Sequence, residues 1–264
     1  MISHTRHGEL PAIRITAPDG AQATIALYGA HLLSWKTPDG KERLFLSACS
    51  PMDGSAAIRG GVPVIFPQFS TRGDGQRHGV ARLSHWRLGA SGSAEDGVYA
   101  EFELTQADVP APLAAGWPHD FALRLRFALQ GNALHMRFNV RNTGADSFSF
   151  ASALHTYYAA GDFLKTTLQG LEQGKIAFGP PLDNIYAAPA ELELRTADSQ
   201  LQLRQQGFTE WVVWNPGAEN AAKLTDMADH EWREFLCIEP ARVDKQELKA
   251  GAEWTGHHTI TVAG

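Results

Sequence analysis

The stretch FALRLRFALQGNALHMRFNV, residues 121–140, decides the fold class. Apolar residues occupy every second position from Phe121 to Leu129 and again from Leu134 to Val140. Gly131-Asn132, between the two runs, is a tight-turn pair. Because side chains alternate between the two faces of a strand, this period of two predicts a long antiparallel hairpin with one face on a core and one in water.

The rest of the chain repeats this short-segment pattern, with turn signals rather than helical periodicity between the segments. Two helical features are expected: a turn over 52–57, and one short helix over 225–234 with Thr225 as its N-cap. The pattern predicts an all-β protein with one large antiparallel β-sandwich and few short helices, in a single domain spanning 1–264. Further strands are expected at 13–15, 24–28, 31–35, 43–46, 98–104, 148–154, 191–194, 201–204, 211–214, 235–238 and 257–262.

Composition and charge exclude several classes of protein. A formal net charge of −6 argues against a nucleic-acid binder, which would carry a broad basic face. Cys49 and Cys237 cannot form a disulfide framework and fit a reducing compartment. No apolar leader or membrane-length run is present, so we expect a cytoplasmic protein with no membrane partner, acting as a monomer.

Residues 58–87 form a basic island in this acidic chain. The island contains five arginines (59, 72, 77, 82 and 87), one acid at Asp74 and no lysine, so its balance is +4. Guanidinium groups match phosphate or carboxylate oxygens, and the neighbouring glycines allow close backbone approach. The pattern indicates an anion site, although solvated surface arginines would give the same composition.

Several common catalytic and binding motifs are absent from the sequence. It has no Gly-x-Ser-x-Gly elbow and no phosphate-binding P-loop. The two cysteines lack metal-ligand spacing, and His257 and His258 should point to opposite faces of a strand, so no metal site is expected.

Two other residues suggest acid–base chemistry. His155 follows an apolar strand, and Glu239 ends the run Phe235-Leu-Cys-Ile-Glu, just before a proline. Partial burial would raise the pKa of such a glutamate and make it a usable base. The alternatives are a hydrogen-bonded structural histidine and an edge salt bridge.

Five motifs, in this order, resemble those of the hexose-6-phosphate mutarotases, or glucose-6-phosphate 1-epimerases, of the aldose 1-epimerase superfamily. The matching stretches are distributed over nearly the whole chain, and the resemblance implies the galactose mutarotase-like supersandwich fold. The motifs are Ile58-Arg-Gly-Gly-Val-Pro63, Phe66-Pro-Gln-Phe69, His78-Gly-Val-Ala-Arg82 with Trp86, Leu154-His-Thr-Tyr157 and Ile238-Glu-Pro240.

The resemblance also implies a function and its residues. The expected reaction is interconversion of the α and β anomers of a hexose 6-phosphate, with glucose 6-phosphate the expected substrate. His155 and Glu239 match the catalytic motifs, Arg59 and Arg82 the substrate-binding arginines, and Asp183 the sugar-contacting aspartate. An Asx turn is the structural alternative for Asp183. No metal or organic cofactor is expected, because only protons are transferred.

One position departs from the family pattern. Relatives often carry glutamine before the His-Gly-x-Ala-Arg motif, whereas this chain has Arg77 there. Either Arg77 makes that contact, or the loop is shifted and Gln76 fills the role. His78 is expected to bond a sugar hydroxyl or to hold the loop. Trp214 could stack on the sugar, although a core position is the simpler expectation.

Two alternative functions stay open. One is an aldose 1-epimerase acting on free sugars such as galactose, which would leave the arginine charges unpaired. The other is a non-catalytic carbohydrate-binding sandwich, which would not need both His155 and Glu239.

Overall fold

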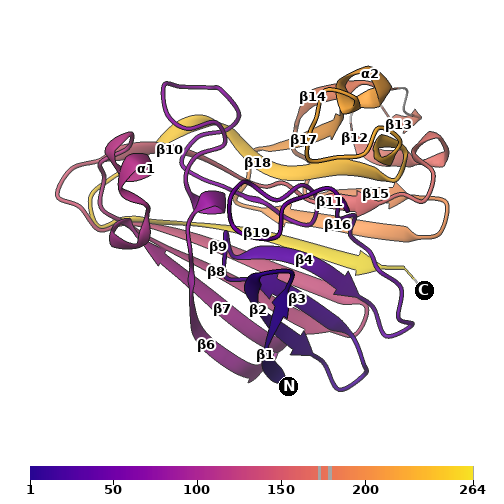
Figure 1. The fold of residues 1–264 in the computed structure, drawn as a ribbon, viewed down its shortest axis with the longest axis horizontal. Helices are drawn as coiled ribbons and strands as arrows, with labels where there is room; N and C mark the ends of the chain where they lie inside the picture. Colours follow the sequence, from indigo (N-terminus) through magenta and orange to yellow (C-terminus); the bar gives the residue numbers. More distant parts are fainter. Residues whose placement is uncertain (172–173, 178–179, 264) are drawn as a thin grey trace.

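The computed structural model describes residues 1–171, 174–177 and 180–263. Within these ranges the strands form three antiparallel sheets (Figure 1). The expected antiparallel sandwich is therefore confirmed.

The largest sheet contains the hairpin expected at residues 121–140. Leu129 pairs with Leu134 across its turn. All nine alternating apolar residues of the hairpin are at most 2% exposed, so one face of the sheet is core, as expected. In spatial order its strands are β13 (Gly174–Ala177), β12 (Thr167–Leu171), β15 (Glu191–Arg195), β16 (Gln200–Gln206), β19 (Glu253–Val262), β9 (Ala133–Asn142), β8 (Phe121–Gln130), β7 (Gly97–Thr105) and β6 (Arg87–Ala94).

Two smaller sheets cover the apolar face of this sheet. Ile13 and Trp35 of the first share a core cluster with Phe102 and Phe127 of the large sheet. The first sheet contains β1 (Ile2–His7), β2 (Leu10–Thr16), β3 (Gln22–Ala26) and β4 (His31–Lys36). The second has the order β14 (Leu182–Ala187), β17 (Glu210–Asn215), β18 (Phe235–Leu248), β10 (Phe148–Leu154) and β5 (Val64–Ile65), with β11 (Tyr157–Ala159) also paired to β18.

Alternation along β17 and β18 gives the second small sheet two different faces. Trp211 packs on His258 of β19, with ring centroids 5.6 Å apart, and Arg242 lies over Trp254 of the same strand. The even-numbered residues of β17 and the odd-numbered residues of this part of β18 must therefore point away from the large sheet. Glu239 lies on this outer face.

Helices contribute little to the described part of the chain. The α-helices are α1 (Ala111–Ala115) and α2 (Gly217–Ala221), and the 3-10 turns are η1 (Ala81–Leu83), η2 (Gln106–Asp108), η3 (Phe163–Lys165) and η4 (Glu231–Arg233). Among the residues described, no helix combines the length and apolar character needed to cross a membrane.

Some sequence expectations were wrong. The helix expected over 225–234 is an irregular loop that ends in η4, because the Glu231 carboxylate accepts hydrogen bonds from Ser47 and Ala48 instead of supporting a helix. Within 52–57, where a turn was expected, residues 53–56 form bends, and residues 43–46 form isolated bridges rather than a regular strand.

Candidate active site

A cavity of about 270 Å³ opens on the outer face of the second small sheet. Five residues of the predicted site line it: Arg59, Arg77, His78, Arg82 and His155. Trp214, considered above as a stacking residue, also lines it, and the structure adds Tyr157 and Asp226.

Strand register brings the catalytic candidates together. In the ladder, Tyr157 and Trp214 are both opposite Cys237, two residues before Glu239. His155 follows the last residue of β10, and its backbone N–H donates to Pro63 at 3.0 Å. Cross-strand neighbours share a face, so these side chains converge at one place.

His155 and Glu239 form a buried pair. Nδ1 of His155 lies 3.2 Å from Oε1 of Glu239, and the two side chains are 10% and 1% exposed. Among the described residues, neither Nδ1 of His155 nor the second carboxylate oxygen of Glu239, Oε2, has a partner that meets hydrogen-bond geometry. Glu239 does not line the cavity, so it lies behind His155 in this structure.

Burial opposes charge on both members of this pair. It raises the pKa of Glu239 well above its usual value, and the negative charge of Asp183 adds to the effect. Burial likewise lowers the pKa of His155, helped by His78 and the nearby arginines. Both directions favour the uncharged form of the pair, in which Glu239 carries the proton and the His155 imidazole is neutral.

Tyr157 links His155 to the arginines. The two rings stack with centroids 4.8 Å apart and planes 9° from parallel. The Tyr157 hydroxyl accepts a hydrogen bond from Nη1 of Arg59 at 3.1 Å. The indole of Trp214 meets the His155 ring edge-on at 5.9 Å. Contacts on both sides therefore fix the plane of the imidazole.

Arg59 is already paired within the cavity. Its Nε and Nη2 atoms both donate to the Asp226 carboxylate, and the shortest nitrogen–oxygen distance is 3.0 Å. Asp226 lies in the loop before η4, and the buried Glu231 holds this loop by accepting from Ala228 N–H at 2.9 Å. Sequence reasoning missed Asp226, because a single acid in a loop has no pattern of its own.

Arg82 is the arginine left available for a ligand. Its Nη2 donates to the Arg77 carbonyl at 3.1 Å, whereas its buried Nε has no partner among the described residues. Burial lowers the pKa of Arg82 to about 10, and the neighbouring positive charges of Arg59 and Arg77 contribute. A bound anion would relieve both the desolvation and the repulsion.

His78 holds the loop and also faces the cavity. Its backbone has φ +61°, and its Nδ1 accepts from the Ser70 N–H at 3.3 Å. Its ring contacts the rings of Phe69 and His155, at 5.5 and 5.7 Å. Burial lowers the pKa of His78 to about 3, so the ring is neutral and its Nε2 carries the hydrogen.

Besides Glu239, two predicted residues lie outside the cavity. Gln76 lines a neighbouring cavity of about 220 Å³ instead, whereas Arg77 lines the site itself. Asp183 lies within β14, opposite Trp214, with its side chain exposed. The Asx-turn alternative is therefore wrong, and Asp183 stands on the same sheet face as Glu239.

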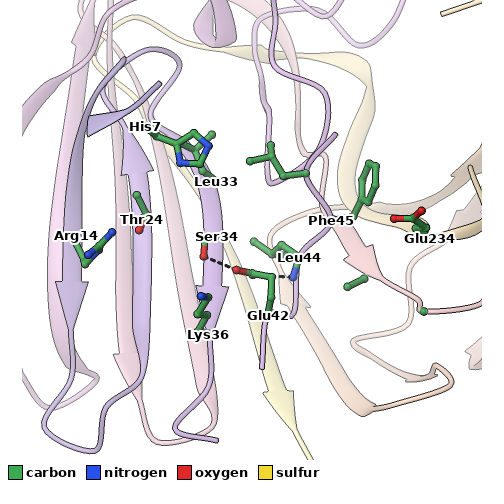
Figure 2. A pocket seen from close by; sticks show the side chains of 13 residues that line it. His7, Arg14, Thr24, Leu33, Ser34, Lys36, Glu42, Leu44, Phe45 and Glu234 are labelled. Carbon is green, nitrogen blue, oxygen red and sulfur yellow. Dashed lines mark hydrogen bonds between the residues drawn. The ribbon is translucent and has the colours of Figure 1, made fainter. Parts of the chain in front are cut away.

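A larger, more open groove lies elsewhere, between β1–β4 and residues 42–46 (Figure 2). Its volume is about 720 Å³, but none of the predicted site residues lines it. Glu42, at its centre, bonds Ser34 and the backbone N–H of Leu44, which is a structural role. Over the described ranges, no cluster of three or more His, Cys, Asp or Glu residues is placed to hold a metal.

Comparisons with known proteins agree with this geometry. A protein of Cenchrus ciliaris named "Putative glucose-6-phosphate 1-epimerase" is 34% identical, with 90% of this chain and 80% of that protein aligned. One of the same name from Escherichia coli K12 is 32% identical, covering 91% and 86%. The crystal structure of a "putative mutarotase" from Salmonella typhimurium superposes with a TM-score of 0.88 at 29% identity, covering 99% of this chain and 93% of that one. The family model for aldose 1-epimerase matches residues 11–176 and 160–261. The chain is therefore an enzyme of the aldose 1-epimerase family, whose members interconvert sugar anomers.

Proposed function

We propose that the protein interconverts the α and β anomers of a hexose 6-phosphate, with glucose 6-phosphate the first candidate. One observation carries the proposal: the cavity that contains His155, backed by Glu239, also contains Arg82, whose buried Nε has no partner among the described residues. A neutral sugar would leave the charge of that guanidinium without a counter-charge. The names of the relatives point to the same substrate.

The net charge of the cavity also fits a phosphate dianion. Three guanidinium groups (Arg59, Arg77 and Arg82) and one carboxylate (Asp226) line it, which leaves +2 while His78 and His155 are neutral. A dianion brings the total to zero. Because Asp226 already occupies two donor groups of Arg59, we assign the main phosphate contacts to Arg82 and Arg77.

The chemistry needs one base at O1 and one acid at the ring oxygen O5. In the reactive form Glu239 is a carboxylate and His155 an imidazolium. Glu239 takes the O1 proton, the C1–O5 bond breaks, and O5 receives a proton from His155, which gives the open aldehyde. Rotation about C1–C2 exposes the other carbonyl face, and the same groups close the ring with their roles reversed. Each positioned group contributes on the order of 10² to 10⁴-fold.

Access to Glu239 sets a geometric requirement. Since His155 lies between Glu239 and the cavity, the sugar must displace the imidazole slightly to reach Oε2, the oxygen without a partner. Asp183, beside Trp214 on the same face, is then placed to accept hydrogen bonds from sugar hydroxyls. The His78 Nε2–H is a further donor.

Magnetisation-transfer NMR tests the proposal directly. Anomer exchange of glucose 6-phosphate should be fast, and exchange of free glucose and galactose should be far slower. Galactose 6-phosphate is measured in parallel to compare the two phosphorylated sugars. Equal acceleration of free and phosphorylated sugars would favour the aldose 1-epimerase alternative. Binding without any acceleration would favour the carbohydrate-binding alternative.

We also propose that residues 1–264 act as one domain and as a monomer in the cytoplasm. A single core cluster joins residues of all three sheets, which supports one domain. Both cysteines are free, with Cys49 exposed and Cys237 buried, which fits a reducing compartment.

A further inference from the structure

His155 is placed between a proton donor and a group of cations. Glu239 approaches its Nδ1 from β18, at 3.2 Å. On the other side the imidazole borders the arginine-lined cavity. Titratable or charged groups that act on the ring are Glu239, His78, Tyr157, Arg59 and Arg82, and Asp183 of β14 acts on the Glu239 carboxyl.

This arrangement decides where the shared proton sits when the cavity holds no anion. The positive charges of Arg59 and Arg82 act against a third positive charge on His155, in the same direction as burial. The pair then favours neutral imidazole beside a protonated Glu239. The reaction needs the opposite form, with imidazolium beside carboxylate.

A dianion removes that influence. Two negative charges next to Arg82 and Arg77 cancel the +2 of the cavity, so the field at His155 no longer opposes the imidazolium. A chain of direct contacts also joins the arginines to His155, since Arg59 donates a hydrogen bond to the Tyr157 hydroxyl and the Tyr157 ring stacks on His155. The anion end and the proton-transfer end of the cavity are thus electrostatically connected.

We propose that the arginine cavity is an activating site as well as a binding site. A phosphate-like dianion held there moves the shared proton from the Glu239 carboxyl to Nδ1 of His155, even when the dianion is not attached to the sugar. No bond to carbon changes in this step, and the number of protons on the pair stays at one. The inference rests on the proposed function, in which the 6-phosphate of the substrate is the natural dianion.

Phosphite dianion is the probe, because it resembles a phosphate group without the sugar. Anomer exchange of glucose is measured with enzyme and increasing phosphite, and the enzyme-free rate at each phosphite concentration is subtracted. We expect a saturable increase in kcat/KM for glucose of at least about tenfold, the effect of roughly one pKa unit. In parallel, the ¹⁵N shifts of His155 should move toward the imidazolium values when phosphite binds.

Two arginine variants serve as a matched pair. Arg82→Ala should abolish the activation by phosphite. Arg72→Ala removes an arginine from the same island, but Arg72 is exposed, pairs with Asp244 at 2.7 Å and does not line the cavity. This variant should retain both basal activity and activation.

Three results would overturn the inference. Phosphite could compete with glucose 6-phosphate without accelerating glucose, it could fail to bind at all, or it could activate Arg82→Ala as strongly as the wild type. Failure of the proposed function looks different, because glucose 6-phosphate itself would then show no enzymatic anomer exchange. Exchange of glucose 6-phosphate without any phosphite effect would leave the proposed function standing alone.

Discussion

The ion pair between Arg59 and Asp226 makes an unusual prediction about a double substitution. Arg59→Ala removes one cation from the cavity and leaves the Asp226 carboxylate facing the phosphate without a partner. The cavity charge falls from +2 to +1, and the remaining carboxylate repels the ligand. Asp226→Ala added to Arg59→Ala returns the cavity charge to +2. The second substitution should therefore restore part of the activity that the first one removes.

The magnitude follows from the contacts. Loss of a charged hydrogen bond costs about 1.5–3 kcal/mol, and an unpaired, half-buried carboxylate adds about 1–2 kcal/mol. Arg59→Ala should thus lose about 2.5–5 kcal/mol of transition-state stabilisation, or roughly 70- to 5,000-fold in kcat/KM for glucose 6-phosphate. The double variant should recover about tenfold of that loss. Both side chains are partly exposed, at 22% and 25%, so solvent screening keeps the stability cost small.

The assay is anomer exchange of glucose 6-phosphate for the wild type, both single variants and the double variant. Thermal unfolding of each protein controls for folding. A folded double variant that is as slow as Arg59→Ala would refute the reasoning, because Asp226 would then not act through charge. An equal loss of activity toward free glucose in Arg59→Ala would instead assign Arg59 to the positioning of Tyr157.

Three further predictions concern the proton-transfer pair, a buried histidine and a glycine. His155→Ala and Glu239→Gln should each lower kcat by about 10² to 10⁴-fold while circular dichroism stays unchanged; near-native rates in both would remove the pair from the mechanism. Burial lowers the pKa of His31 to about 4, so the native protein keeps it neutral while the unfolded chain takes up a proton below about 6.5. The contribution of His31 to the free energy of unfolding is thus fully present above that pH and falls by up to roughly 3 kcal/mol toward pH 4. In His31→Asn, the free energy of unfolding should depend less on pH over this range. Gly79→Ala would place Cβ 2.0 Å from a backbone carbonyl oxygen at φ +74°, so we expect a loss of about 1–3 kcal/mol with weakened substrate binding. Gly131→Ala, at φ +57° with no atom within 4 Å of the new Cβ, should cost clearly less in the same thermal scan.

Strands with strong alternation could be predicted from the sequence, and weak ones could not. Residues 121–140 show a period of two, since one face is entirely buried. β1 and β6 are polar or rich in Gly and Ser, and β14 has mostly exposed side chains, so their pairing depends on neighbouring strands rather than on burial. The helix expected at 225–234 failed for a similar reason, because the contacts of Glu231 with a distant segment outweigh local propensity.

The site could be predicted where chemistry and motif coincide. Recognisable sequence motifs contain His155, Glu239 and Arg82, and these three residues lie close together in the structure. Asp226 could not be predicted, because its role depends on a contact with Arg59, which lies 167 residues away in the sequence. The position of Gln76 likewise depends on the loop geometry, which the sequence does not determine.

The two ends of the cavity are built from different kinds of backbone. Glu239 lies inside a strand and His155 at the end of another, whereas Arg77 and Asp226 come from loops. Loops tolerate substitution and insertion far better than paired strands. Substrate preference can therefore evolve, or be engineered, by exchanging loops around an unchanged acid–base pair. The same architecture could in this way serve sugars that differ only at the end remote from the anomeric carbon.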